Sequence, residues 1–309
     1  MSKNLTLSVS PHIHSGKSTS RVMLDVLIAL SPAAIAGVVI FGLRALLVLA
    51  VTVLSCVGFE ALYNVLLKKE QTVGDLSAAV TGLLLGMNLP ANIPLWQCVI
   101  GSLFAVIVVK ALFGGLGCNP VNPAITARVF MLVAFGAMTK AAAPTVVDTV
   151  AGATPLAAET STTTLTDLLL GLHGGAVGET CSIALLAGLV YLLIRRVITW
   201  HIPVSFVGCV FVCSFFMEGM DLEAAVAAIL AGGLLIGAIF MATDYVTSPV
   251  NAWGKIIFGV GAGLITFLIR YFGIYPEGVS FAILFMNILT PYIDSWTRHK
   301  VFGVGGKNA

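Results

Sequence analysis

The sequence predicts an all-α integral membrane protein with about ten transmembrane helices, arranged as two inverted five-helix repeats. The first observation behind this prediction is composition: of 309 residues, 58% are hydrophobic and only 10% are charged, and the mean hydropathy is +1.03. A soluble domain carries roughly 25% charged residues, because its surface must face water. The other two observations are the lengths of the apolar runs and the partial repetition of their sequence.

The composition also excludes several classes of protein. The net charge of +2, without a basic patch that contains interleaved aromatic residues, argues against nucleic acid as a partner. The apolar content excludes disorder. The six cysteines form no CxxC pair and have no spacing with histidine that suits a metal, so we expect no metal site. The expected surroundings are a lipid bilayer.

The apolar runs match the length of helices that cross a bilayer, about 20 residues each. Residues 1–21 form a polar N-terminal tail, and residues 297–309 form a polar C-terminal one. The first repeat, residues 22–138, contains the predicted spans Val22–Phe41, Leu43–Leu67, Gly74–Leu89, Pro94–Phe113 and Pro120–Met138. The second, residues 181–296, contains Cys181–Thr199, Pro203–Met217, Leu222–Thr243, Lys255–Phe272 and Val279–Trp296.

Lysine and arginine predict how these spans are oriented, because such residues concentrate in cytoplasmic segments. Most of the basic residues, among them Lys68, Lys69, Arg195 and Arg196, fall on the same side as both ends of the chain. We therefore expect a multi-pass protein of the cell (inner) membrane. Both termini should be cytoplasmic, and the loop over residues 139–180 should be external.

The two halves share short stretches of sequence. TGLLLG at Thr81–Gly86 recurs as GGLLIG at Gly232–Gly237, and the apolar run Val99–Gly115 is echoed by Ile257–Gly273. Because each half has an odd number of spans, the second half must enter from the opposite face. Transport folds with such inverted repeats place their sites where the halves meet, at short or broken helices.

The external loop, residues 139–180, has two interpretations. It is rich in threonine, alanine and glycine and lacks aromatic residues, which is typical of a solvated tether. Alternatively, DTVAGATP at Asp148–Pro155 is a specific site. The hydroxyl of Thr154 can become the alcohol half of a phosphate ester, and Gly152 and Ala153 are small neighbours.

Several motifs together resemble those of the D subunits of the Rnf ion-translocating electron-transport complexes. That family is similar to the B subunit of the sodium-translocating NADH:quinone oxidoreductase. The resemblance covers essentially the whole chain. It depends on SPHIHSGKSTSRVMLDVLIAL at Ser10–Leu30, TGLLLGMNLP at Thr81–Pro90, GGLGCNPVNPA at Gly114–Ala124, AGATPLA at Ala151–Ala157 and FMATDYVTSP at Phe240–Pro249.

The resemblance implies a covalent cofactor. In this family a threonine carries FMN through a phosphoester bond installed by a flavin transferase. The matching acceptor is Thr154, within a motif that includes Asp148, Gly152 and Ala153. Ala151 replaces the usual hydroxyl residue, which we expect to alter recognition by the transferase only mildly.

The resemblance also implies a function and partners. The chain would be a membrane subunit of a ferredoxin:NAD oxidoreductase complex that couples electron transfer to sodium or proton transport. It is not expected to be catalytic alone, and no catalytic residue is assigned. The implied partners are other Rnf subunits, including the flavin-carrying G subunit and the membrane-embedded A and E subunits. The implied fold is similar to that of urea transporters.

Polar residues inside the predicted spans are further candidates, because intramembrane charge requires a partner or a function. The helix-breaking run Gly114–Ala124 either shapes a cavity or caps the next span. Its Asn119 and Asn122, with Arg128, are candidates for a second, non-covalent flavin. The candidates for an ion path are Asp25, Glu60 and Asp244, each of which has a local structural role as its alternative.

Two other functions remain open from the residues alone. A ten-span inverted repeat also suits a solute channel or transporter without a redox role. A membrane scaffold without its own cofactor is the other alternative. The motif that contains Thr154 disfavours both.

Overall fold

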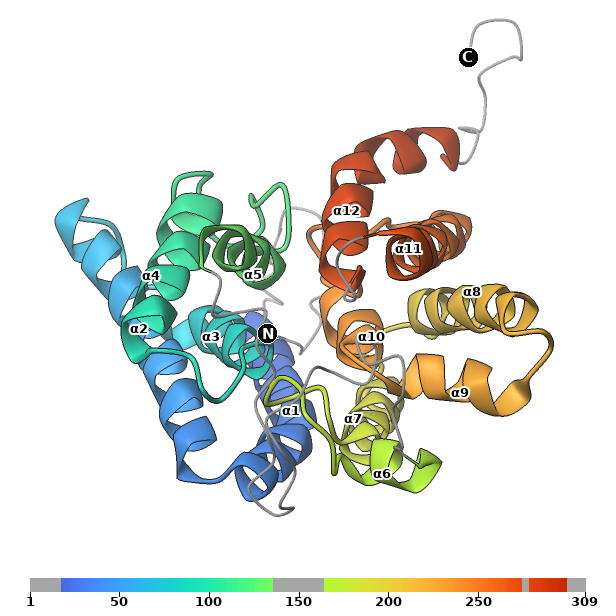
Figure 1. The fold of residues 1–309 in the computed structure, drawn as a ribbon. Coiled ribbons are helices and arrows are strands. Elements are labelled where there is room, and N and C mark those ends of the chain that lie inside the picture. The colour runs from blue at the N-terminus through green and yellow to red at the C-terminus, as the bar shows by residue number, and fades with distance from the viewer. Residues whose placement is uncertain (1–17, 136–163, 274–277, 299–309) are drawn as a thin grey trace, which may run out of the picture.

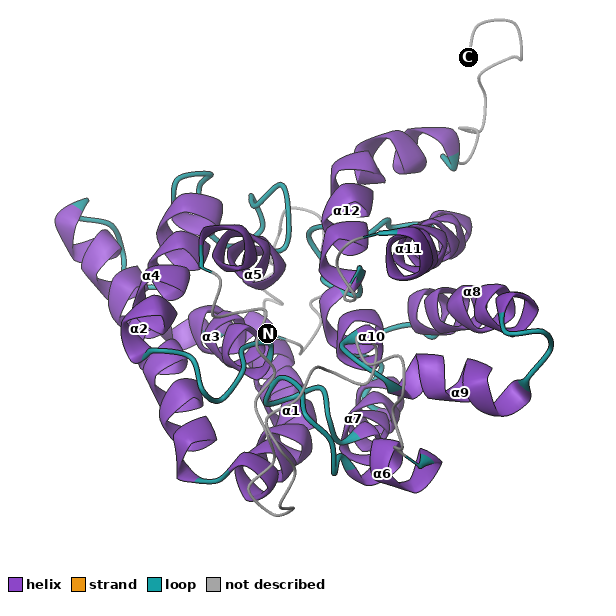
Figure 2. Cartoon of the chain, in the orientation of Figure 1, coloured by secondary structure: helices purple, strands orange, loops and turns teal. Residues whose placement is uncertain are grey.

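The computed structural model describes residues 18–135, 164–273 and 278–298, and this part of the chain is built from helices without a strand (Figures 1 and 2). The first half contains α1 (Thr19–Phe41), α2 (Leu43–Leu66), the short η1 (Val73–Asp75), α3 (Ser77–Met87), α4 (Leu95–Leu103) with its π-helical continuation η2 (Phe104–Ala111), and α5 (Pro123–Ala134). The second contains α7 (Ser182–Ile194), α8 (His201–Met217), α9 (Leu222–Leu230), α10 (Leu234–Ile236) with the π-helical η4 (Gly237–Met241), α11 (Ala252–Phe272) and α12 (Val279–Trp296).

Every predicted span therefore contains a helix, but the helices differ in length. Among the described residues, α1, α2 and α11 are long and apolar enough to cross a membrane, and a bent pair of helices adds a fourth candidate. Among the same residues, five apolar helices have between 10 and 17 residues, and α12 has 18. The helical and apolar character of the chain is confirmed, whereas ten crossings stay a prediction.

The predicted span Leu222–Thr243 is divided between two helices. Its two parts, Leu222–Leu230 and Leu234–Met241, are bent by 64°. The bend lies at Ala231–Gly233, where Gly232 has a φ of 69°. This left-handed conformation ends a helix, and a glycine adopts it without the steric cost of a Cβ atom.

The helices of each half pack in the same order. In the first half α2 packs against α3 and α4, and in the second α8 packs against α9 and α11. Across the boundary α1 packs against α7, and α5 packs against α12. Figure 1 shows the blue-to-green half beside the yellow-to-red half, with these helices at the junction. The corresponding helices of the two halves thus meet each other.

The described end of the long loop is packed into the protein. Thr164 caps the short helix α6 (Leu165–Leu170) by a reciprocal capping box with Asp167. The following turn enters the core, where the backbone amides of Val177 and Gly178 donate hydrogen bonds to the carbonyl oxygens of Leu89 (3.1 Å) and Met87 (2.7 Å). The solvated-tether interpretation was therefore wrong for this part, because composition does not reveal a segment that packs against a core built elsewhere.

Candidate functional site

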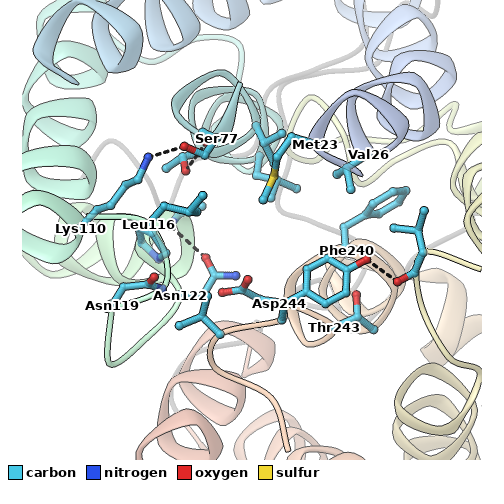
Figure 3. A pocket seen from close by; sticks show the side chains of 18 of the residues that line it. Met23, Val26, Ser77, Lys110, Leu116, Asn119, Asn122, Phe240, Thr243 and Asp244 are labelled. Atoms are coloured by element: carbon cyan, nitrogen blue, oxygen red, sulfur yellow. Dashed lines mark hydrogen bonds between the residues drawn. The ribbon is translucent and has the colours of Figure 1, made fainter. Parts of the chain in front are cut away.

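A cavity of about 100 Å³ lies where the two halves meet, and we call it the central cavity. Most of its wall is apolar, with Met23, Val26 and Leu84 from the first half and Phe240 from the second. A polar group of side chains completes the lining: Ser77, Lys110, Asn119, Asn122, Thr243 and Asp244. In Figure 3, Lys110 and Asn119 lie on the left of this space, and Asp244 lies beside Asn122.

Asn122 positions the start of α5 beside the central cavity. Its side-chain Oδ1 accepts hydrogen bonds from the backbone amides of Ala124 (3.0 Å) and Ile125 (3.4 Å). Its Nδ2 donates to the carbonyl oxygen of Met241 (3.1 Å) in the other half. The capping interpretation of this motif is therefore confirmed, and the same side chain also lines a cavity and joins the two halves.

Asp244 lies in the turn that follows η4, three residues after Met241, and its side chain lines the central cavity. Thr247 Oγ1 donates a hydrogen bond of 3.1 Å to Asp244 Oδ2, and the amide of Ser248 donates to the Asp244 carbonyl oxygen at 3.1 Å. These contacts stabilise the turn before Pro249. Asp244 therefore caps this turn, which is the structural role that the sequence offered as an alternative to an ion path. Its side chain also faces Asn119 and Asn122.

Arg128 belongs to a different polar cluster and does not line the central cavity. Its Nη1 donates to Asn88 Oδ1 (2.8 Å) and to Ser280 Oγ (3.1 Å), and its Nη2 lies 3.8 Å from Glu179 Oε2. Glu179 Oε1 accepts a hydrogen bond of 2.9 Å from the amide of Ala176. Arg128 has the counter-charge that its position requires, and this ion pair joins the first half to the loop.

Glu60 lies in α2 and forms a buried ion pair with Lys110, whose Nζ is 2.8 Å from Glu60 Oε1. Lys110 Nζ also donates to Ser77 Oγ at 2.6 Å. Thr72 Oγ1 donates to the same Glu60 oxygen at 3.2 Å. A cavity of about 270 Å³, here called the side cavity, lies against Glu60, Thr72 and Lys110.

Asp25 is the third candidate for an ion path, and it lies in a half-exposed network. Its carboxylate accepts hydrogen bonds from Tyr191 Oη (3.0 Å) and from the guanidinium of Arg195 (3.2 Å). These residues face or adjoin a larger cavity of about 590 Å³, here called the end cavity, which Arg21 and Arg196 also line. The three ion-path candidates therefore lie at three different cavities.

The three cavities adjoin one another. The central and side cavities share Lys110 and Leu116 in their walls. The central and end cavities share several residues, namely Met23, Leu116, Val197, Tyr245 and Val246. Leu116 lies in the walls of all three cavities.

Sequence reasoning missed Lys110, Ser77 and Glu179. Lys110 is 3% exposed, and a lysine inside the apolar run Pro94–Phe113 was a signal that could have identified it. Ser77 carries no comparable signal. Glu179 was assigned to an external loop, and nothing in its neighbours predicts that it enters the core. The attachment-motif residues Asp148, Gly152, Ala153 and Thr154 lie outside the described residues, so their roles stay predictions.

The lining of the central cavity suits a flat aromatic ligand with polar edges, because apolar walls surround a few convergent polar groups. A flavin ring has this chemistry. The cavity alone is smaller than the roughly 300–1,000 Å³ of typical ligand sites. The adjoining end cavity supplies further space, and its arginine and tyrosine side chains suit the polar part of such a ligand.

The apolar helices, with a largely apolar cavity between the two halves, define a helical membrane protein. The model of the NQR2, RnfD, RnfE family matches residues 6–303, and the chain belongs to this family.

Three relatives match nearly the full length. The D subunit of the Na(+)-translocating ferredoxin:NAD(+) oxidoreductase complex of Acetobacterium woodii is 47% identical, over 97% of this chain and 96% of its own length. The proton-translocating counterpart of Clostridium ljungdahlii is 40% identical, over 97% of both chains. The D subunit of the ion-translocating oxidoreductase complex of Escherichia fergusonii is 36% identical, over 96% of this chain and 98% of its own. The resemblance to the D subunits of Rnf complexes is confirmed.

Proposed function

We propose that this protein is a membrane subunit of an ion-translocating ferredoxin:NAD oxidoreductase complex, in which it carries electrons in a process coupled to sodium or proton transport. The observation that carries this proposal is similarity over nearly the whole chain to relatives named as the D subunits of such complexes. Partner subunits would bind ferredoxin and NAD. The G, A and E subunits of the Rnf complex are the partners that we propose.

Thr154 is the proposed attachment point of FMN, through a phosphoester bond installed by a flavin transferase. The support is the motif itself, which provides the acceptor hydroxyl next to two small residues, Gly152 and Ala153, and after Asp148. The bound flavin supplies the electron-carrying chemistry, while the chain retains and positions it.

The central cavity is the proposed site of a second, non-covalent flavin. Asn119, Asn122 and Asp244 would contact its polar edges, while Met23 and Phe240 would contact its ring. The roles of Asn119 and Asn122 as candidates are supported by their position in this wall. Arg128 is not part of this proposed site, since its partners are Asn88, Ser280 and Glu179.

The proposed architecture is ten membrane crossings in two inverted repeats of the urea-transporter type. The matching order of helix packing in the two halves supports it. Both termini would be cytoplasmic and the loop that contains Thr154 would be external, in the cell (inner) membrane. The ion path would use the carboxylates of Asp25, Glu60 and Asp244, which line or adjoin neighbouring cavities.

The mass of the intact protein tests the proposed cofactor. The chain should be produced together with a flavin transferase, purified, and compared with Thr154→Ala and Thr154→Ser. We expect the wild type and Thr154→Ser to carry the added mass and in-gel fluorescence of FMN, because both retain a hydroxyl. Thr154→Ala should carry neither.

The same preparation distinguishes the alternatives. An unmodified wild type, made alongside a transferase that modifies a known substrate in the same cells, would remove the support for a flavin-carrying subunit. A solute channel or a scaffold without a cofactor would give that outcome.

A further inference from the structure

Lys110 forms part of the wall between the central cavity and the side cavity, since it lines both. Its Nζ lies 2.8 Å from Glu60 Oε1, toward the side cavity, and 2.6 Å from Ser77 Oγ, which lines the central cavity. Ser77 Oγ in turn donates to Asp75 Oδ1 at 2.6 Å. One ammonium group therefore contacts a separate acceptor toward each cavity.

The Glu60 carboxylate has unused capacity to bind a cation. Its Oε1 accepts from both Lys110 and Thr72, whereas the buried Oε2 has no hydrogen-bond partner in the structure. The side chain is only 8% exposed. A buried carboxylate oxygen without a partner is costly, and oxygen ligands of this kind suit a small hard cation such as sodium. The Thr72 hydroxyl, 3.2 Å from Glu60 Oε1, provides a second oxygen, and it also accepts a hydrogen bond of 3.0 Å from Asn64 Nδ2.

The backbone around Lys110 is also unusual. It lies in the π-helical segment η2 (Phe104–Ala111) rather than in a regular α-helix. Such segments are rare and occur frequently at functional sites. From this segment Lys110 Nζ contacts Glu60 of α2 and Ser77 of α3.

We propose that the ammonium of Lys110 competes with sodium for a binding site at Glu60. Through this competition, Lys110 couples sodium binding to the charge of the ligand in the central cavity. This inference deepens the proposed function and rests on it for the identity of the central ligand. With the site empty, the ammonium of Lys110 neutralises Glu60. When sodium binds to the Glu60 and Thr72 oxygens, the ammonium is displaced toward Ser77 and the central cavity.

The coupling follows from charge alone. Displacement moves a positive charge toward the central cavity, which favours a more negatively charged ligand there. By reciprocity, a ligand that gains negative charge attracts Lys110 and leaves Glu60 open to sodium. The occupants of the two cavities then both shift the Lys110 side chain between a position at Glu60 and a position toward Ser77. A group with two arrangements that both sites affect is the physical requirement for coupling between sites. The relative named as sodium-translocating agrees with sodium as the ion to test.

The test uses the full-length chain, purified in detergent, with thermal unfolding as the measure of sodium binding. Sodium chloride is titrated at constant ionic strength against choline chloride, for the wild type and variants. For Lys110→Met we expect half-maximal stabilisation at about tenfold lower sodium, a change within the usual range of coupling between sites. Ser77→Ala should raise the sodium concentration of half-maximal stabilisation several-fold, because the displaced ammonium loses its alternative acceptor.

Two further variants serve as controls. Glu60→Gln, alone or combined with Lys110→Met, should remove the stabilisation by sodium. Lys69→Met should resemble the wild type, since Lys69 lines the same cavity but its Nζ lies over the ring of Tyr63, at 5.2 Å from the centroid. Because Ser77→Ala keeps the ion pair, it provides the test even if Lys110→Met does not fold.

The proposal is overturned if Lys110→Met or Ser77→Ala leaves the sodium dependence at the wild-type value. It is also overturned if only pH, and not sodium, distinguishes Lys110→Met from the double variant, because Glu60 is then merely a titrating carboxylate. None of these measurements requires a flavin or electron transfer. Failure here is therefore distinguishable from failure of the proposed function, which the mass of Thr154 variants reports.

Discussion

Charged residues in the described part of the chain occur in two settings that differ in burial. Arg128 and Glu179 are 7% and 2% exposed and lie in the core, whereas the side chain of Arg195, which binds Asp25, is 55% exposed. Removing one member of a buried pair leaves the other charge in a medium that solvates it poorly. An exposed charge is solvated by water after its partner is removed.

We therefore predict different effects for two equivalent substitutions. Arg128→Met should lower the free energy of unfolding by about 3–5 kcal/mol, because the Glu179 carboxylate loses the cation 3.8 Å away. Arg195→Met should cost about 0–1 kcal/mol. Thermal unfolding in detergent measures both. Equal losses in the two variants would show that the Arg128 cluster contributes no more than a surface pair.

For single residues, the sequence predicted some of the buried charges but not their partners. An arginine inside an apolar run predicts that it has a partner, but the partner of Arg128 is Glu179, in a segment with the composition of a loop. In the second buried ion pair, Glu60 was a candidate from the sequence, whereas its partner Lys110 was not. A single sequence identifies buried charges, whereas their pairing depends on helix packing that the local pattern does not contain.

Helices in this protein approach closely where glycine permits it. A Cβ atom at Gly188 of α7 would lie 2.4 Å from the carbonyl oxygen of Ala29 in α1, so the two halves touch backbone to backbone there. Gly58 of α2 has no atom within 4 Å of the corresponding position. Small residues at helix contacts are typical of membrane proteins, in which packing stabilises association.

Gly188→Ala should consequently destabilise the junction of the halves by about 1–3 kcal/mol, the usual cost of overpacking. Gly58→Ala is the matched control and should be neutral or stabilising by up to about 1 kcal/mol, since alanine favours a helix more than glycine does. Thermal unfolding of both variants checks this. A Gly188→Ala variant as stable as Gly58→Ala would contradict the close approach of α1 and α7.

The positions of the helices were more predictable than their shapes. Apolar runs predicted a helix in each span because hydropathy depends only on composition along the chain. The bend between α9 and α10 and the π-helical turns at η2 and η4 were not predicted. They depend on single backbone conformations, such as that of Gly232, and on which neighbours fill the space beside them.

At the scale of the whole molecule, the central cavity lies between two halves whose helices pack in the same order. It adjoins a side cavity that contains a buried ion pair and an end cavity lined by arginines. This arrangement places the proposed cofactor site next to carboxylates suited to a cation. It therefore supports an account in which electron transfer and ion transport meet in one subunit.

The most direct test of that account uses inverted membrane vesicles from cells that lack their own D subunit but contain the other Rnf subunits and a flavin transferase. Vesicles with this chain should reduce NAD when supplied with reduced ferredoxin and should accumulate sodium or protons at the same time. Vesicles with Thr154→Ala, at equal amounts of assembled complex, should lose both activities. Equal NAD reduction and ion uptake with and without the Thr154 hydroxyl would contradict the account.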